Sequence, residues 1–182
     1  MAKVDLSGLP VQLNNTMRLD RVPCELRCTK EEFGNSKASG NPMFTRTWEV
    51  ISPETIKLPG IDSSVLLTGT EVIQYLPLKN VKEPEKTTAM LMRFKQEQIK
   101  LGLNADDIDD ENPALECEGI VARGEITSEE RTAMTRPTPE EVANGVKPQP
   151  ILNEDGTEKK VYYPKLRAIY GKSEASMNKQ FA

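Results

Sequence analysis

The sequence predicts a mainly β domain in which one helix lies between the third and fourth of five strands. Three observations support this fold class. Short segments alternate apolar and polar residues, one segment has the period of a helix, and turn-forming residues separate them. A chain of 182 residues is long enough for one well-buried core. We predict a single domain over residues 21–171, an N-terminal arm over 1–20 and a C-terminal tail over 172–182.

The first three strands are predicted in the first half of the chain. Residues 21–29 place three apolar side chains on one face and charged side chains on the other. The stretch 33–42, FGNSKASGNP, is rich in turn-forming residues and is predicted to be a loop. Residues 43–51 are rich in β-branched and aromatic types, as strands are. A third strand is predicted over 65–78, with a break or bulge at Gly69.

The helix and the last two strands follow. Apolar residues recur at steps of three and four over 85–103, and Gly102 is a plausible end for this helix. The fourth strand is predicted over 115–126 and the fifth over 161–170, separated by the long polar stretch 127–159. This element order is that of the oligonucleotide-binding (OB) barrel, in which 127–159 is the 4–5 loop. A generic α+β sandwich shows the same order.

Composition excludes several classes of protein. The absence of histidine excludes Ser-His-Asp hydrolases, most zinc enzymes and any histidine base. Glu116 and Glu118 share a strand face, but no lysine or further acid completes a two-carboxylate nuclease site, so we predict no enzyme. No apolar run spans a membrane and no secretory signal begins the chain, which predicts a cytoplasmic protein without membrane partner or cofactor.

The cysteines and the acidic loop are predicted to hold no metal. Cys24 and Cys28 lie four apart on one strand face, and Cys117 is the only other thiol. Small, buried core residues explain them better than zinc ligands do. The acidic stretch 104–113 lacks the glycine and the final glutamate of a calcium-binding loop.

Charge is distributed unevenly around a net value of -4. Residues 83–128 carry eleven acidic and five basic residues, whereas 157–182 carry two acidic and six basic ones. In an OB barrel, strands 2 and 3 and the loops 1–2 and 4–5 form a groove that holds single strands by aromatic stacking and cationic contacts. The 1–2 loop region supplies Lys30 and Lys37, and Arg123 lies on the fourth strand; all three are predicted to bind DNA.

The second strand carries an aromatic and cationic row. Phe44, Arg46 and Trp48 alternate on one face, which suits base stacking with a phosphate partner between the rings. The alternative is that both rings fill the core of a small barrel, with Arg46 at its mouth. Both interpretations stay open at this point.

The fifth strand carries a second such row. Tyr163, Lys165 and Arg167 form an exposed basic strip, and we predict that they bind DNA. The other face, which includes Tyr162 and Tyr170, is predicted to belong to the core. The alternative for the basic strip is an ordinary solvated strand face.

Four segments resemble phage-encoded single-stranded-DNA-binding proteins. They are GNPMFTRTWEVI (40–51), the loop-strand-helix run that follows it to Leu103, LECEGIVARGEI (115–126) and YYPKLRAIYG (162–171). The resemblance implies an OB barrel that coats single-stranded DNA without sequence preference, beside replication or recombination proteins in the host cytoplasm. Many such proteins end in an acidic tail. Here the tail is GKSEASMNKQFA, so recruitment by an acidic tail is not implied, and Phe181 is the residue suited to anchor a partner.

A second function hypothesis is a phage structural or host-interaction protein that binds no nucleic acid. The net acidity and the aromatic content of 5% favour it. The sequence leaves the oligomeric state open between a monomer and a homo-oligomer.

Overall fold

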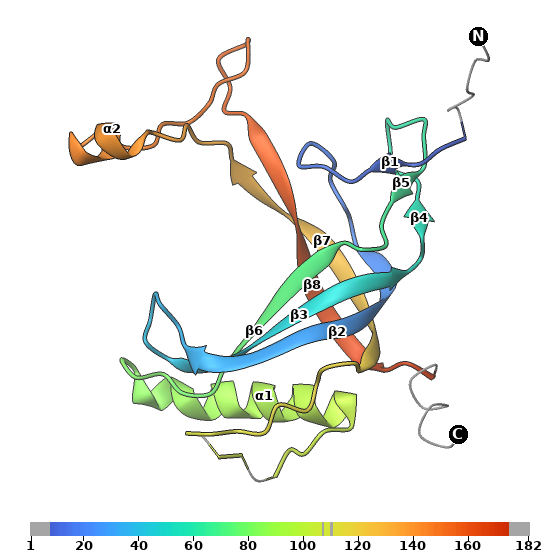
Figure 1. Cartoon of the computed structure of the whole chain (residues 1–182), viewed down its shortest axis with the longest axis vertical. Coiled ribbons are helices and arrows are strands. Elements are labelled where there is room, and N and C mark those ends of the chain that lie inside the picture. The colour runs from blue at the N-terminus through green and yellow to red at the C-terminus, as the bar shows by residue number, and fades with distance from the viewer. Residues whose placement is uncertain (1–7, 107, 110, 175–182) are drawn as a thin grey trace.

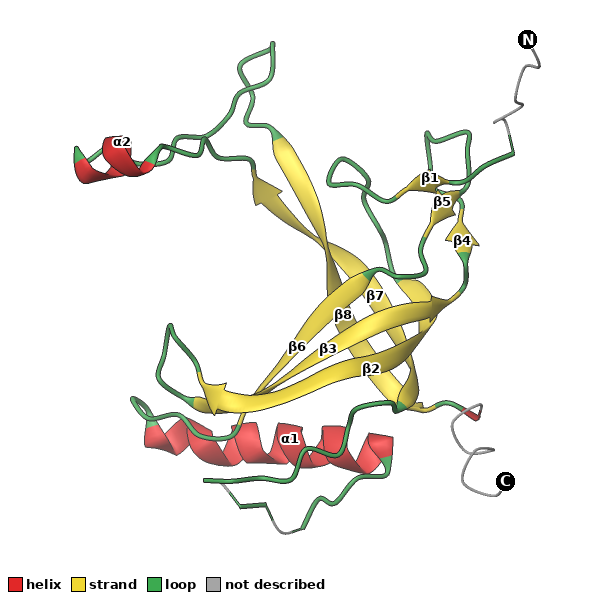
Figure 2. Cartoon of the chain, viewed as in Figure 1, coloured by secondary structure: helices red, strands yellow, loops and turns green. Residues whose placement is uncertain are grey.

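The computed structural model describes residues 8–106, 108–109 and 111–174. These residues form a mainly β protein with two sheets and one long helix (Figures 1 and 2). The elements are β1 (Val11–Gln12), β2 (Val22–Asn35), β3 (Pro42–Ser52), β4 (Thr55–Ile56), β5 (Val65–Leu66), β6 (Glu71–Pro77), the 3-10 helix η1 (Pro84–Lys86), α1 (Thr87–Leu101), β7 (Val121–Thr132), α2 (Pro139–Ala143) and β8 (Lys160–Lys172). The mainly β fold class and the position of the helix were correctly predicted.

The large sheet has the order β6-β3-β2-β7-β8, and all its neighbours are antiparallel. The sheet curves so that its edge strands β6 and β8 approach one another, but no hydrogen-bonded ladder joins them. The five strands of the predicted OB-type barrel are present, but among the described residues the sheet does not close, and a seam between β6 and β8 stays open. Pro164 on β8 donates no backbone hydrogen bond, and two register shifts in the β7–β8 ladder increase its twist.

The small sheet has the order β1-β5-β4. In the chain, β1 precedes β2, whereas β4 and β5 lie between β3 and β6. The predicted break at Gly69 is present: this residue has φ +82 and separates β5 from β6. Part of the predicted N-terminal arm is structured, since β1 pairs with β5 and Leu19 is buried in the core. The predicted tail lies largely outside the described residues, including Phe181.

Helix α1 covers one end of the curved sheet (Figure 1). Gly102 ends it in the left-handed conformation, with φ 66, and its N–H donates to the Ile99 carbonyl at 3.0 Å. Phe94, Gln98 and Leu101 are buried against the strands, as the helical period predicts.

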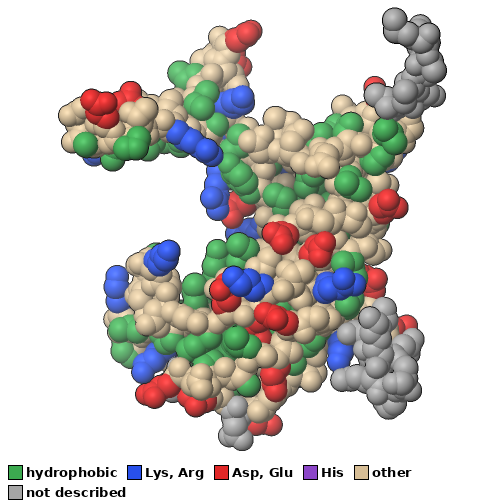
Figure 3. Space-filling model, viewed as in Figure 1, with side chains coloured by type: hydrophobic (Ala, Val, Ile, Leu, Met, Phe, Trp, Pro, Cys, Tyr) green, Lys and Arg blue, Asp and Glu red, His purple; other side chains and the backbone are tan. Residues whose placement is uncertain are grey.

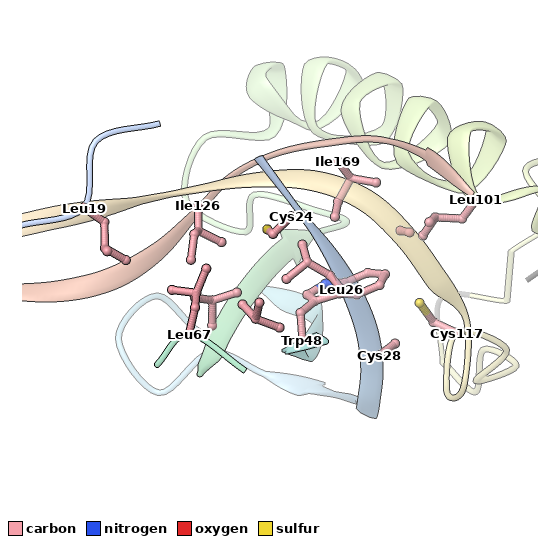
Figure 4. Packing of buried hydrophobic residues seen from close by; sticks show 13 residues of the cluster. Leu19, Cys24, Leu26, Cys28, Trp48, Leu67, Leu101, Cys117, Ile126 and Ile169 are labelled. Carbon is pink, nitrogen blue, oxygen red and sulfur yellow. The ribbon is translucent and has the colours of Figure 1, made fainter. Parts of the chain in front are cut away.

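The main core lies between the inner face of the sheet and the loops that close its ends (Figure 4). Trp48 and Leu26 lie at its centre, with Leu101 and Ile169 nearby. The three cysteines are buried free thiols, as expected for small core residues. Burial raises the pKa of the Cys24 thiol to about 11, so this thiol is protonated at neutral pH.

The stretch predicted to be a polar 4–5 loop has a definite structure. Its first residues continue β7 to Thr132, and residues 133–159 form a projection that we call the extension (Figure 1). Backbone hydrogen bonds hold the extension together, from Ala133 N to Lys159 O at 2.8 Å and from Ile151 N to Ala133 O at 2.8 Å. None of its residues is buried.

Candidate nucleic-acid interface

The aromatic and cationic row of β3 lies in the core. The exposed fractions of Phe44, Arg46 and Trp48 are 2%, 0% and 0%. The prediction that these side chains stack on bases is therefore wrong, and the alternative that they fill the core is the one observed. The alternation was assigned correctly, but the face that contains these three residues points inward, toward α1.

The buried Arg46 has hydrogen-bond partners on two of its three guanidinium nitrogens, whereas its Nη1 has none among the described residues. Its Nε donates to Glu31 Oε1 at 2.7 Å and its Nη2 donates to Gln98 Oε1, while its guanidinium lies 5.9 Å from the ring centroids of Phe44 and Phe94. The second oxygen of Glu31 accepts from Cys117 N at 2.8 Å. This network connects β2, β3 and α1, so it serves the fold.

Trp48 belongs to a parallel chain of hydrogen bonds. Its Nε1 donates to Gln74 Oε1 at 3.1 Å, and Gln74 Nε2 donates to Glu97 Oε2 at 3.0 Å. The polar tip of the tryptophan is thereby satisfied inside the core, as buried indoles require.

The outer row of β8 is exposed, as predicted. Tyr163, Lys165 and Arg167 all face solvent. Tyr170, which was predicted to be core, is 57% exposed, while Ile169 is buried instead. Register shifts in the β7–β8 ladder explain the error, because each extra residue on β8 reverses the alternation that follows it.

The seam between β6 and β8 is hollowed along its length. One hollow is lined by Ile73 and Tyr75 of β6, by Arg93 of α1 and by Lys165 and Arg167 of β8. Two further hollows follow β8 toward the extension and share Tyr163. We call these three neighbouring hollows together the seam groove.

Two tyrosines and an arginine gather along the seam groove. Tyr75 is 55% exposed and Tyr163 is 42% exposed. The Arg131 guanidinium lies 5.4 Å from the ring centroid of Tyr163. Hydrogen bonding to Glu129 raises the pKa of Arg131, and Tyr163 and Tyr75 add smaller electrostatic contributions, so all three side chains lie near one another.

A deep notch separates the extension from the β2–β3 hairpin, and basic side chains gather on both of its sides (Figure 3). The hairpin side includes the 36–41 loop and the segment after β6, which are joined by a hydrogen bond from Val81 N to Asn41 Oδ1 at 2.9 Å. The exposed basic residues of these two sides are Lys37, Lys79 and Lys82 near the hairpin and Arg136, Lys147 and Lys159 in the extension. Among the described residues, none of these six forms an ion pair within 4.0 Å.

Glutamates of β7 neutralise part of the groove. Glu129 pairs with Arg131 at 2.9 Å and with Lys165 at 3.4 Å. Glu125 accepts hydrogen bonds from Arg167 and, at 2.8 Å, from the Tyr170 hydroxyl. These contacts hold the pKa of both carboxyl groups below their ordinary value, Arg131 acting first on Glu129 and Arg167 first on Glu125. Glu129 and its partners are partly exposed, so a phosphate group can displace these pairs at little cost, whereas Glu125 is buried.

The remaining predicted site residues are dispersed. Lys37 lies on the hairpin side of the notch, whereas Lys30 pairs with Glu32 at 2.8 Å on the outer face of β2. Arg123 is exposed at the start of β7, opposite Gly171, and lines none of the hollows along the seam.

Sequence reasoning missed Tyr75, Arg93 and Arg131. Tyr75 had a usable signal, since the alternation over β6 places it on the strand face opposite to that of the buried Gln74 and Leu76. Arg93 and Arg131 had none, because only the fold brings α1 and the end of β7 to the same seam.

Comparison of the chain with protein-family models, with curated proteins and with solved structures found no match. Among the described residues, no helix is long and apolar enough to cross a membrane, and no three Cys, Asp or Glu side chains gather as metal ligands.

Proposed function

We propose that this protein binds single-stranded DNA without sequence preference, along the seam groove and between the two sides of the notch. The observation that carries the proposal is the pair of exposed tyrosines, Tyr75 and Tyr163, beside Arg131 in a groove flanked by unpaired basic side chains. Flat aromatic faces and cations are the two components that hold single strands irrespective of sequence.

The arrangement of strands supports the proposal. We propose an OB-type arrangement with one open seam. The chain order of the five long strands, the helix between β6 and β7, and the β2–β3 and β7–β8 connections at the notch support it. In that fold, single strands bind across strands 2 and 3 between the same two connections. A role in phage replication or recombination, which the sequence resemblance implies, belongs to the same proposal.

In this proposal, bases stack on Tyr75 and Tyr163 while phosphates contact the cations. Arg93 has no ion-pair partner among the described residues and is available directly. Arg131 and Lys165 become available when phosphate replaces Glu129, because both pairs are exposed.

A fluorescent oligothymidine titrated with the full chain at two salt concentrations tests the proposal, with a duplex of equal length as control. We expect binding to the single strand, with a slope of log affinity against log salt of about -0.7 for each phosphate contacted. Binding that does not change with salt, or that prefers the duplex, would contradict this account.

A second candidate is a protein-interaction role without nucleic acid. The observation that favours it is the exposed apolar content of the extension, which includes Val142 and Leu152 at 57% exposure each. Failure of the parent chain to bind oligothymidine even at low salt would favour this candidate.

A further inference from the structure

The extension presents apolar side chains that no other described residue covers. It holds a defined shape through its backbone hydrogen bonds and through a capping box in which Thr138 and Glu141 bond one another's backbone. Yet none of its residues is buried, and its exposed large apolar residues are Met134, Val142, Val146, Ile151 and Leu152. An ordered projection with an uncovered apolar surface is typical of a contact with another macromolecule.

A large cavity lies elsewhere among the described residues, between the N-terminal segment and the β4–β5 hairpin. Its volume is about 1570 Å³, which exceeds the roughly 300–1,000 Å³ of ordinary small-molecule sites. Its walls include the half-buried apolar side chains of Met17, Ile56, Leu58 and Ile61. Both its size and its lining suit a segment of polypeptide.

The two surfaces carry small charge excesses of opposite sign. The cavity is lined by the basic residues Arg18, Arg21 and Lys57 and by only two acidic ones, Asp20 and Asp62. The extension has the opposite excess, with three basic residues against the five acidic residues Glu140, Glu141, Glu154, Asp155 and Glu158. Arg21 is also the only described non-glycine residue with a positive φ, at 48, on the wall of this cavity.

The extension points away from the cavity of its own chain. In Figure 1, α2 and the small sheet β1-β5-β4 lie on opposite sides of the molecule, so the extension of one chain cannot fill its own cavity. We infer that the extension of one copy docks into the N-terminal cavity of a second copy, with its apolar side chains against the cavity walls and its acidic residues beside the basic rim. Because the two contact surfaces differ, a dimer keeps one extension and one cavity free, so the association continues from copy to copy.

This inference concerns contact between copies and does not require DNA. Sedimentation velocity of the full chain without DNA, over a range of concentrations, tests it. We expect species larger than a monomer that grow with concentration. Val142→Asp in the extension and Ile61→Asp in the cavity should each weaken the association at least about tenfold, because each places a charge in an apolar contact.

Mixing the two variants gives the sharpest result. The Val142→Asp variant keeps its cavity intact and the Ile61→Asp variant keeps its extension intact. The mixture should therefore form a one-to-one dimer and nothing larger. Met92→Asp is the matched control, since Met92 is a 60% exposed apolar residue on α1, away from both surfaces, and this variant should associate like the parent. If Ile61→Asp lowers the melting temperature, the charge reversal Lys57→Glu replaces it, because Lys57 is exposed.

Three outcomes would overturn the inference. The parent could remain monomeric at every concentration, or the cavity variants could associate as strongly as the parent, or the mixture could remain monomeric while each variant is folded. Any of these leaves the DNA-binding proposal untouched, because that proposal is tested on oligothymidine.

Discussion

Two strands of this protein carry similar rows of residues in opposite environments. On β3, the row Phe44, Arg46 and Trp48 is almost completely buried, and its cation is held by Glu31. On β8, the row Tyr163, Lys165 and Arg167 is exposed, and its cations pair with the partly exposed Glu129 and with the buried Glu125. The comparison shows that an aromatic and cationic row is open to a ligand only when the strand's other face supplies the core.

The largest expected effect comes from the buried row. Trp48→Ala should lower the free energy of unfolding by about 3–5 kcal/mol, because it leaves a cavity at the centre of the core. Chemical denaturation of the parent and the variant measures the difference. A loss below about 1 kcal/mol, which is typical of surface positions, would place Trp48 outside the core.

The second-largest effect is expected at the buried ion pair between Glu31 and Arg46. Glu31→Gln leaves the Arg46 guanidinium buried without a counter-charge, and we expect a loss of about 3 kcal/mol of unfolding free energy. Glu32→Gln is the matched control on the neighbouring residue, where the exposed pair with Lys30 contributes less than about 1 kcal/mol. Equal effects of the two variants would contradict the contrast between the environments.

The buried row of β3 also shows what the sequence could predict. Alternation correctly divided β3 into two sets, but it is symmetric and does not say which set faces inward. The arginine in the buried set made that set resemble a surface, and its partners Glu31 and Gln98 lie 15 and 52 residues away in the chain. Their convergence depends on the fold and has no local signal.

Other parts of the molecule show the same contrast between features with a local sequence signal and features that depend on the fold. The helix and its end at Gly102 could be predicted, since period and capping are local properties. Tyr170 could not be placed, because register shifts depend on the partner strand. The seam groove is formed by β6, α1, β7 and β8, so only one of its parts, the β8 row, was visible in the sequence.

A smaller effect is expected at the exposed row. Glu129→Gln should strengthen oligothymidine binding by less than about 1 kcal/mol, because Arg131 and Lys165 then meet phosphate without a competing carboxylate. Fluorescence anisotropy at low salt measures the change. Weaker binding by the variant would mean that Glu129 positions these cations instead of competing for them.

The smallest effect concerns acid stability. Hydrogen bonds from Arg167 and then Tyr170 hold the pKa of Glu125 below its ordinary value of 4.5. The carboxylate is therefore stabilising above pH 4.5, and this contribution is lost as the pH falls through the lowered pKa of the folded state. The difference in unfolding free energy between the parent and Glu125→Gln should be constant above pH 4.5 and shrink below it. A difference independent of pH would show that the charge of Glu125 does not matter.

The most direct test of the central claim compares two ways of removing exposed tyrosines. The double variant Tyr75→Ala and Tyr163→Ala is measured for oligothymidine affinity and melting temperature beside Tyr170→Ala, an equally exposed tyrosine of β8 that lines none of the described hollows along the seam. We predict that the double variant loses about 1–3 kcal/mol of binding free energy for each base that no longer stacks, with little change in melting temperature, while Tyr170→Ala binds like the parent. Equal affinity of the double variant and the parent, with both folded, would contradict the assignment of DNA binding to the seam groove.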